Sequence, residues 1–398
     1  MKLLSVEDAR SRMLAAVTAT DRETVSLAAA MGRVLARDVR ASRDQPPFAA
    51  SAMDGWAVRT ADSPGRLRIV GESAAGSAYP EALGAGEAVR IFTGAPVPAG
   101  ADAVVIQEDA HRDGDHVVIP AVSDPRHIRP AGQDFTAGTL LLTRGTRLDA
   151  WRLSLAAAAG LPGLEVARRP RTVILSTGEE IISPGRSPGP FQIFNSGTTA
   201  LAALTEGWGA RPDALTEVGD DAGAIAAAVA GAGGDLIVTI GGASVGDHDL
   251  VKPALRTLGL EMIVESVAVR PGKPTWFGTL ADGRRVLGLP GNPASAMVCA
   301  ELFLRPLLYA MQGADPAVGL ITARTTTALA DNGAREHWMR ARLTYGADGA
   351  IAATPFADQD SALVNVFAQA DALVRRAVRA PAVEPGDTVD VLPLRRLV

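Results

Sequence analysis

The sequence predicts a multidomain protein of the α/β plus β class, in which a central α/β domain lies between β regions. Short β-like runs punctuated by prolines fill residues 41–145, apolar strands alternate with helices from 170 to 312, and short strands return over 316–398. Strands that alternate with helices of about 10–15 residues are typical of βαβ units and a parallel sheet. A chain of 398 residues is long enough for two to four domains at about 100–200 residues each.

The first segment, residues 1–44, is predicted to be helical. Ser5 precedes acidic residues as a helix N-cap does, and apolar residues recur at helical spacing up to Val17. A second short helix is expected from Ser26 to Ala36, although Gly32 weakens that pattern.

A small β domain is predicted over residues 45–131, and a return linker that contains a helix over 132–168. The β domain is indicated by the runs WAVRT, LRIVG, AVRIFTG, AVVIQE and HVVIP. In the linker, helical character is expected from 146 to 165, closed by Gly160 and Pro162.

The α/β domain is predicted over residues 169–313. Its buried strands are expected in RTVILST, DLIVTIGG and RRVLGLPG, and its helices in FNSGTTALAALTEGWG, DAGAIAAAVAGAG, HDLVKPALRTLG and NPASAMVCAELFLRPLLYAM. Four further strand-like runs, GLITARTTT, REHWMRARLTY, ALVRRAV and DTVDVLPL, predict a C-terminal β domain over 314–398.

Composition excludes several classes of function. Apolar residues make up 47% and charged residues 21% of a chain with a net charge of −5, and no stretch is basic enough to indicate nucleic-acid binding. The single cysteine, Cys299, excludes a disulfide framework and is expected to be a buried, inert thiol. The start lacks a signal-like apolar region, and the run LSLAAAAGLPGLEVA is too short to span a membrane. We therefore expect a cytoplasmic protein.

Three loops that follow predicted strands carry the candidate binding residues. Ligands bind open α/β sheets at the carboxyl ends of the strands. The loops contain Thr177, Gly178, Gly241, Gly242, Ser244, Gly246, Pro290, Gly291, Asn292 and Pro293. The glycine-rich loop could cradle a phosphate or be a simple tight turn, and Asp247 and Asp249 directly after it favour Mg²⁺ beside a phosphate. Asn292 and Pro293 suit a helix start, which capping alone would explain.

Two cations three residues apart, Arg270 and Lys273, lie in the sequence Arg-Pro-Gly-Lys-Pro. Only three of the 39 basic residues are lysines, and a lysine ammonium is not interchangeable with a guanidinium at an anion site. We therefore favour an oxyanion site here over a surface charge pair.

Further candidates lie outside the α/β domain, at Asp54, Thr93 and Asp134. Each of them is also compatible with an ordinary turn. The five histidines show no metal-ligand spacing such as HExxH.

Seven segments together carry a resemblance to a known family. They are PPFAASAMDGWAVR, IFTGAPVPAGADAVVIQE, IRPAGQDFTAGTLLL, ILSTGEE, TIGGASVGDHD, VRPGKPTWFG and GLPGNPASA. In this order they resemble the MoeA-type molybdopterin molybdenumtransferases, the family that also includes the C-terminal domain of gephyrin.

The resemblance implies an elongated homodimer with a helical linker region, a β lid domain, a central three-layer α/β domain like the molybdopterin adenylyltransferases, and a C-terminal β domain. The implied reaction inserts molybdenum from molybdate into the dithiolene of adenylylated molybdopterin and releases AMP with Mg²⁺. The implied site lies between subunits, where the lid of one faces the α/β domain of the other. Transient contacts with the molybdopterin adenylyltransferase and with apo-molybdoenzymes are expected, and nucleic acid and membranes are not.

The resemblance also assigns residues to roles. The implied catalytic residues are Asp54, Thr93, Asp134, Glu180, Asp220 and Asp249. Of these, Glu180, Asp220 and Asp249 are the expected Mg²⁺ ligands, with the adjacent Asp221 as an alternative to Asp220. The implied molybdate-binding residues are Arg270, Lys273, Arg340 and Ser361.

The chain departs from the family pattern at three positions. Arg270 stands where the family has lysine, Ala49 where it usually has aspartate, and Trp56 where it usually has tyrosine. Two other hypotheses stay open: an adenylyltransferase in which the α/β domain acts alone, and a scaffold protein that has reused the fold.

Overall fold

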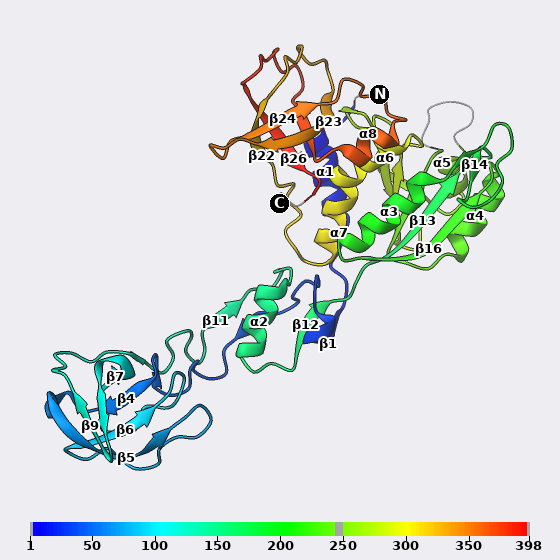
Figure 1. Cartoon of the computed structure of the whole chain (residues 1–398). Helices are drawn as coiled ribbons and strands as arrows, with labels where there is room; N and C mark the ends of the chain where they lie inside the picture. Colours follow the sequence, from blue (N-terminus) through cyan, green and yellow to red (C-terminus); the bar gives the residue numbers. More distant parts are fainter. Residues whose placement is uncertain (1–2, 243–249, 396–398) are drawn as a thin grey trace.

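The computed structural model describes residues 3–242 and 250–395. The molecule is elongated, as Figure 1 shows, with a small β domain at one end, a narrow middle part, and the α/β and C-terminal β domains at the other end. The chain passes through the middle part twice, so this part joins the two ends by two strands of polypeptide. The exact domain boundaries given in the sequence analysis are not tested by this arrangement and stay predictions.

The N-terminal segment contains one helix where two were expected. Helix α1 (Val6–Ala15) begins as predicted, since the Ser5 side chain accepts a hydrogen bond from the backbone N–H of Asp8. It packs on α7 (Arg305–Met311) and β18 (Glu261–Val264), within the core of the α/β domain. The helix expected at Ser26–Ala36 is wrong, because only the short 3-10 turn η1 (Leu27–Ala29) forms there and Gly32 adopts a φ of +72°.

The middle part is stabilised by pairing between its two passes. Strand β1 (Arg22–Ser26) pairs antiparallel with β12 (Gly163–Ala167), and β2 (Val39–Arg40) pairs with β11 (Leu140–Leu142). Helix α2 (Ala150–Ala158), capped by Asp149, is shorter than the helix predicted from 146 to 165. Leu164 and Val166 lie instead in β12, where they pack with Leu35 in a small core. Cross-chain pairing thus overrides local helical preference.

The small β domain is a six-stranded sheet in the order β7-β4-β6-β5-β9-β8. Its strands are β4 (Gly55–Val58), β5 (Gly65–Ser73), β6 (Glu87–Ile91), β7 (Ala103–Ile106), β8 (His111–Asp113) and β9 (His116–Ile119). A separate pair, β3 (Ala50–Ser51) and β10 (Ile128–Arg129), lies where the chain enters and leaves the domain. Trp56 is buried in the core of the sheet.

The central domain is a three-layer α/β structure whose sheet has the order β16-β13-β17-β21-β20-β18. The first four strands are parallel, and the last two are antiparallel additions. The strands not yet given are β13 (Arg171–Thr177), β16 (Arg211–Val218), β17 (Leu236–Ile240), β20 (Trp276–Thr279) and β21 (Arg285–Leu289). The carboxyl ends of β13, β17 and β21 therefore meet at one edge of the sheet.

Helices cover both faces of this sheet. Helix α1, α3 (Ser196–Gly207), α6 (Pro293–Cys299) and α7 share one core with Ile174 and Leu287. Helices α4 (Ala222–Gly231) and α5 (Val251–Arg256) pack on the other face against Val173 and Ile237. Strands β13, β17, β20 and β21 place alternate side chains in the two cores, as a doubly covered sheet requires.

The long helix predicted over 292–311 forms with a wide turn in its middle. Helix α6 continues through a π-helical segment, Ala300–Leu304, into α7. Among the described residues, Pro293–Met311 is the one helical stretch long and apolar enough to cross a membrane, and 83% of its apolar window is buried inside the fold. It is longer than the apolar run that the sequence singled out, and its apolar side chains form the domain core.

The C-terminal domain closes into a barrel-like sheet. Its strands β22 (Ile321–Thr325), β23 (Glu336–Tyr345), β24 (Ile351–Pro355), β25 (Ala372–Arg376) and β26 (Thr388–Pro393) follow the order β23-β24-β22-β26-β25, and β25 pairs back with β23. The short helix α8 (Val364–Gln369) precedes β25. Strand β19 (Val269–Arg270), which belongs to the α/β segment of the chain, adds to this sheet beside β23.

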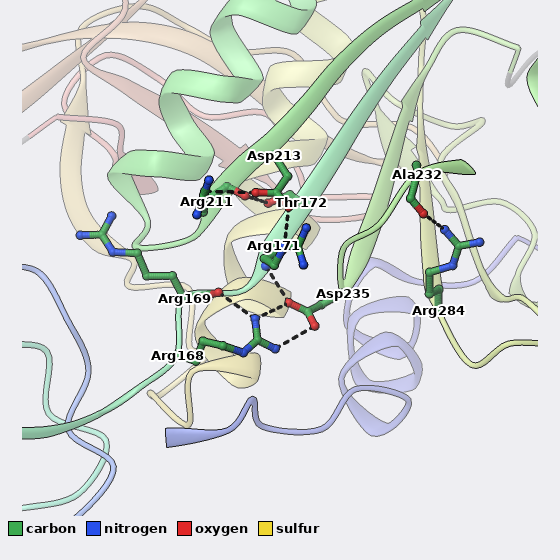
Figure 2. A network of polar contacts seen from close by, with 9 residues as sticks. All are labelled: Arg168, Arg169, Arg171, Thr172, Arg211, Asp213, Ala232, Asp235 and Arg284. Atoms are coloured by element: carbon green, nitrogen blue, oxygen red, sulfur yellow. Dashed lines mark hydrogen bonds and ion pairs between the residues drawn. The ribbon is translucent and has the colours of Figure 1, made fainter. Parts of the chain in front are cut away.

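An ion-pair network attaches the middle part to the α/β sheet at the edge opposite the carboxyl ends. Figure 2 shows Arg168, just after β12, pairing through both guanidinium nitrogens with Asp235, which precedes β17, at 2.9 Å each. Asp235 also accepts the backbone N–H of Arg171 at 2.7 Å. Arg171 and Arg211 both pair with Asp213. These arginines are used in structure, so they do not form a free basic surface.

Candidate active site

A cleft of about 860 Å³ lies at the carboxyl ends of the parallel strands. The three loops that the sequence singled out converge there, as expected for an open α/β sheet. Eight of the predicted binding residues line it: Thr177, Gly178, Gly241, Gly242, Pro290, Gly291, Asn292 and Pro293. The predicted residues Ser244, Gly246 and Asp249 lie outside the described residues, as do Asp247 and His248.

Two adjacent glycines after β17 are required by the close approach of other groups. Gly241 and Gly242 have φ values of +89° and +58°. A Cβ on Gly241 would lie 2.9 Å from the carbonyl oxygen of Thr177, and one on Gly242 would lie 2.1 Å from a methyl of Val251. Only glycine combines this conformation with this spacing, so the backbone itself forms this wall of the cleft.

Two of the predicted acidic residues reach the cleft. Glu180 follows β13 and Asp220 follows β16, and both line the cavity. Asp221 has another role, because its side chain accepts the N–H of Ala224 at 2.6 Å and caps α4. Of the two adjacent aspartates, Asp220 is therefore the one placed at the site.

The carboxylates at the cleft fit Mg²⁺ chemistry. Mg²⁺ is usually held by one or two carboxylates together with substrate phosphates and water, and Glu180 and Asp220 supply two carboxylates beside the glycine-lined wall. Within 3–242 and 250–395, no group of three His, Cys, Asp or Glu side chains is placed to hold a metal ion. The described residues thus supply two carboxylates to this site, Glu180 and Asp220.

Two of the predicted cations, Arg270 and Arg340, lie on strands that pair where the α/β segment joins the C-terminal domain. Arg270 on β19 is paired in register with His337 on β23, and Arg340 lies three residues further along β23. Lys273 is exposed on the turn that follows β19. Pro274, the next residue, lines the cleft. The pairing of β19 with β23 thus places Arg270 next to the strand that carries Arg340, although the two residues are 70 positions apart in sequence.

Arg340 is fully buried, and its two terminal nitrogens have no hydrogen-bond partner among the residues that the structure describes. Its Nε donates to Oε1 of Gln359 at 3.1 Å, which fixes the plane of the guanidinium. Burial lowers the pKa of Arg340, an effect opposed by the charges of Asp358 and Asp360. A buried guanidinium with free donors is costly unless an acceptor completes it, so this group has the character of an anion site.

The histidine in register with Arg270 is neutral. Burial lowers the pKa of His337 to about 4, and the positive charges of Arg270 and Arg340 act in the same direction. The imidazole therefore adds no positive charge to this cluster near neutral pH.

Asn292 and Ser361 join the two domains at the rim of the cleft. The Asn292 side chain does not cap α6 as predicted, although Asn292 is the N-cap residue and Pro293 begins the helix. Its Nδ2 donates instead to Oγ of Ser361 at 2.8 Å. The backbone N–H of Ala294 donates to the carbonyl oxygen of Ser361 at 3.0 Å. One backbone donor in the first turn of α6 is therefore already occupied.

The three remaining predicted residues are not at the cleft of their own chain. In the β domain, the backbone N–H and hydroxyl of Thr93 donate to Oδ1 of Asp54 at 2.7 and 2.9 Å. Asp134 is exposed on a turn next to Gln45, where the β domain joins the middle part. Figure 1 places the β domain at the far end of the molecule from β13 and α3. Asp54 and Thr93 form a second, separate cluster.

Sequence reasoning missed two residues that organise the site. Asn195 caps α3 through Thr198, and its amide nitrogen also donates to Ser176 and Glu217 at 2.9 and 3.0 Å. Gln359 binds Arg340, as described above. The available signal for Asn195 was its position at the predicted helix start, which ordinary capping also explains. Gln359 carried no local signal.

Cys299 is the inert thiol that the sequence predicts. It is fully buried under the Arg-Pro-Gly-Lys-Pro turn, and burial raises its pKa to about 12. The Thr275 hydroxyl donates to its sulfur at 3.1 Å. Its role is to fill space beneath the turn.

Models of known protein families match successive parts of the chain. Residues 4–160 match the "MoeA N-terminal region (domain I and II)", 173–310 the "Probable molybdopterin binding domain", and 322–394 the "MoeA C-terminal region (domain IV)". The fold and the cleft therefore define an enzyme of molybdenum cofactor biosynthesis.

Individual relatives match most or all of the chain. A molybdopterin molybdenumtransferase of Haemophilus influenzae is 31% identical over all of both chains. One from Nostoc sp. is 39% identical over 74% of this chain and 70% of its own length. Two solved structures of the molybdopterin biosynthesis MoeA protein from Pyrococcus horikoshii cover 100% and 98% of this chain and 100% of their own. Their TM-scores are 0.84 and 0.79, at 30% and 25% identity. The chain belongs to the MoeA family of molybdopterin molybdenumtransferases.

Proposed function

We propose that this enzyme binds adenylylated molybdopterin and molybdate, inserts molybdenum into the dithiolene, and releases AMP in a reaction that depends on Mg²⁺. The observation that carries this proposal is the buried Arg340 guanidinium, whose two terminal nitrogens have no hydrogen-bond partner among the described residues, on the strand that pairs with the strand of Arg270. A preorganised set of cations stabilises an oxyanion without rearrangement. Arg270, Lys273, Arg340 and Ser361 would hold molybdate.

The glycine-lined cleft beside these cations would hold the rest of the substrate. Thr177, Gly178, Gly241 and Gly242 bring backbone close to the cavity, and Pro290–Pro293 line it beside Gly241. Such a surface suits the phosphates of a nucleotide-linked pterin. The finer assignments of Ser244, Gly246 and Asp249 to phosphate and Mg²⁺ remain part of this proposal.

Glu180 and Asp220 would orient Mg²⁺ toward the pyrophosphate of the substrate. When bound, the ion would neutralise charge on the phosphate oxygens as AMP leaves. The carboxylates would also keep the pyrophosphate beside the molybdate cations, so that release of AMP and insertion occur at one place.

The working enzyme would be a homodimer. Asp54 and Thr93 lie in a lid that is far from the cleft of its own chain (Figure 1), and Asp134 lies between lid and linker. The lid of a second copy could complete the site with these three residues. Such an enzyme would act in the cytoplasm, between the adenylyltransferase that supplies its substrate and the apo-molybdoenzymes that receive its product.

Reconstitution tests the proposal. Purified protein, adenylylated molybdopterin, Mg²⁺ and molybdate would be combined, and AMP release and activation of an apo-molybdoenzyme followed. Molybdate-dependent AMP release together with activation is the expected result. ATP consumption with metal-free molybdopterin would favour the adenylyltransferase alternative, and assembly with other proteins without catalysis would favour a scaffold.

A further inference from the structure

The lid contains an arginine enclosed by the three segments that build the Asp54 cluster. We propose that Arg90 is a positioning residue, which holds the Asp54 carboxylate in a fixed, ionised state for the reaction. This inference rests on the proposed function in one respect: the role of Asp54 in catalysis. The placement of Asp54 by Arg90 is a separate statement that can be tested without turnover.

The guanidinium of Arg90 lies between two aromatic rings. Its central carbon is 5.3 Å from the ring centre of Trp56 and 4.7 Å from that of Phe92. Arg90 and Trp56 are directly opposite each other on the paired strands β6 and β4. Two planar contacts restrict the guanidinium far more than a single ion pair on an exposed surface would.

Its hydrogen bonds reach the segments on either side of Asp54. One terminal nitrogen donates to the carbonyl oxygen of Gly55 at 3.0 Å, and the other donates to Oε1 of Gln107 at 2.7 Å. The backbone N–H of Gln107 in turn donates to the carbonyl oxygen of Asp54 at 3.1 Å. Arg90 therefore connects the residue after Asp54 with the residue that binds the Asp54 backbone.

The third segment carries the direct partner of the carboxylate. Thr93 binds Oδ1 of Asp54 through both its N–H and its hydroxyl, and the preceding residue, Phe92, packs on Arg90. A shift of Arg90 would thus move both the loop that carries Asp54 and the residue that orients its carboxylate. Within the described part of the chain, Oδ2 of Asp54 has no hydrogen-bond partner and is free for substrate.

Charge supports the same role. The hydrogen bonds from Thr93 lower the pKa of Asp54 most, burial opposes them in part, and the positive charge of Arg90 makes the smallest contribution, in the lowering direction. Arg90 thus favours the ionised form as well as the position of this side chain.

Trp56 strengthens the contact between the Arg90 guanidinium and its aromatic neighbours. It stands where the family pattern usually has tyrosine, and an indole attracts a cation more strongly than a phenol does. The departure noted in the sequence therefore strengthens the enclosure of Arg90 and leaves its hydrogen bonds in place.

The test uses Arg90→Gln, which removes the charge, with Arg66→Gln as the matched control. Arg66 is an exposed lid arginine paired with Asp113, away from the cluster. The Asp54 carboxyl would be titrated by carbon NMR in the full-length protein, assigned with Asp54→Asn. We expect the pKa of Asp54 to rise in Arg90→Gln and not in Arg66→Gln. An unchanged pKa in Arg90→Gln would overturn the inference.

Turnover then separates this inference from the proposed function. In Arg90→Gln we expect kcat to fall at least about 10-fold, since small misplacements of catalytic groups have effects of this size, with the molybdate KM unchanged. A raised pKa with normal turnover would uphold the positioning role and remove Asp54 from the reaction.

A second variant covers the case in which Arg90→Gln does not fold. Arg90→Lys keeps the charge but lacks the planar fork. Faster exchange of the Thr93 amide proton than in the unmodified protein is expected, because the Asp54–Thr93 hydrogen bond loses its support. Unchanged exchange in this variant would contradict the inference.

Discussion

Asn292 donates a hydrogen bond to the hydroxyl of Ser361 across the junction of the α/β and C-terminal domains, at 2.8 Å. The bond joins a residue of the cleft wall to one that we propose binds molybdate. It links the α/β domain to the C-terminal domain at the rim of the cleft. The proposed molybdate site should therefore be sensitive to residues on both sides of this junction.

Removal of either partner is expected to weaken molybdate binding. One hydrogen bond contributes about 1 kcal/mol, so Asn292→Ala and Ser361→Ala should each raise the molybdate KM roughly 5-fold from this bond alone. Because both variants lose the same bond, the double variant should show less than the product of the two effects. The measurement is the molybdate dependence of AMP release, with Ser123→Ala on the lid as control. Effects that multiply fully would show that the bond is not used.

Arg340→Met is expected to separate stability from function. The guanidinium is fully buried with two unpartnered nitrogens, and replacement of buried charged groups by apolar ones of similar volume is often neutral or stabilising by about 1–4 kcal/mol. The Tm should be unchanged or higher, while molybdate-dependent AMP release is lost. Arg342→Met, on the same strand but exposed, is the control and should retain molybdate binding. A large fall in Tm for Arg340→Met would indicate a structural role instead.

Mixing two inactive variants tests the shared site. If the lid of one subunit completes the cleft of the other, Asp54→Ala and Lys273→Ala should complement each other. Random exchange makes half of the dimers mixed, each with one intact site, which gives about a quarter of full activity. Asp54→Ala mixed with Thr93→Ala should recover nothing, because both changes lie on the lid. Recovery in neither mixture would place each site within a single chain.

The convergence of the three loops could be predicted from sequence, because parallel strands end at one edge of their sheet. The runs that became β13, β17 and β21 were apolar enough to identify. Thr177 is the last residue of β13, and Gly241 and Pro290 directly follow β17 and β21. The placement of Arg270 next to the strand of Arg340 could not be derived this way. It depends on a two-residue strand, β19, pairing with a strand of another domain, and no local pattern encodes such a pairing.

The N-terminal segment shows a second limit of local patterns. The residues from Ser26 to Ala36 suit a helix by composition. In the structure, however, Leu35 pairs with Val166 and buries its side chain in the core of the middle part. Contacts over 130 residues of sequence decided the structure there.

Gly272→Ala is expected to displace the turn that carries Lys273. Gly272 has a φ of +116°, and a Cβ there would lie 2.1 Å from the sulfur of Cys299. The turn must move or the thiol must give way, so the molybdate KM should rise at least about 10-fold. Adding Cys299→Ala should restore part of the affinity, because it relieves the clash but not the backbone strain. Cys299→Ala alone is the control. Full affinity in Gly272→Ala would mean that Lys273 does not contact molybdate.

Asp235→Asn is expected to destabilise the attachment of the middle part in a pH-dependent way. Burial alone would raise the pKa of Asp235, but its bonds to Arg168 and Arg171 outweigh burial, and the net shift is downward. A carboxyl whose pKa is lower in the folded state stabilises the fold above its unfolded pKa of about 3.9. That contribution is lost as the pH falls through the folded pKa.

Urea unfolding tests this expectation. At pH 7, the free energy of unfolding of the Asp235→Asn variant should be lower by about 1–3 kcal/mol. The difference from the unmodified protein should shrink as the pH falls below about 4, where Asp235 begins to take up a proton in the unfolded chain while it stays ionised in the folded protein down to its lower folded pKa. Asp113→Asn, which breaks an exposed lid pair, should change stability by less than about 0.5 kcal/mol at either pH. A difference for Asp235→Asn that stays constant with pH would mean that the pair with Arg168 does not depend on the charge of the carboxylate.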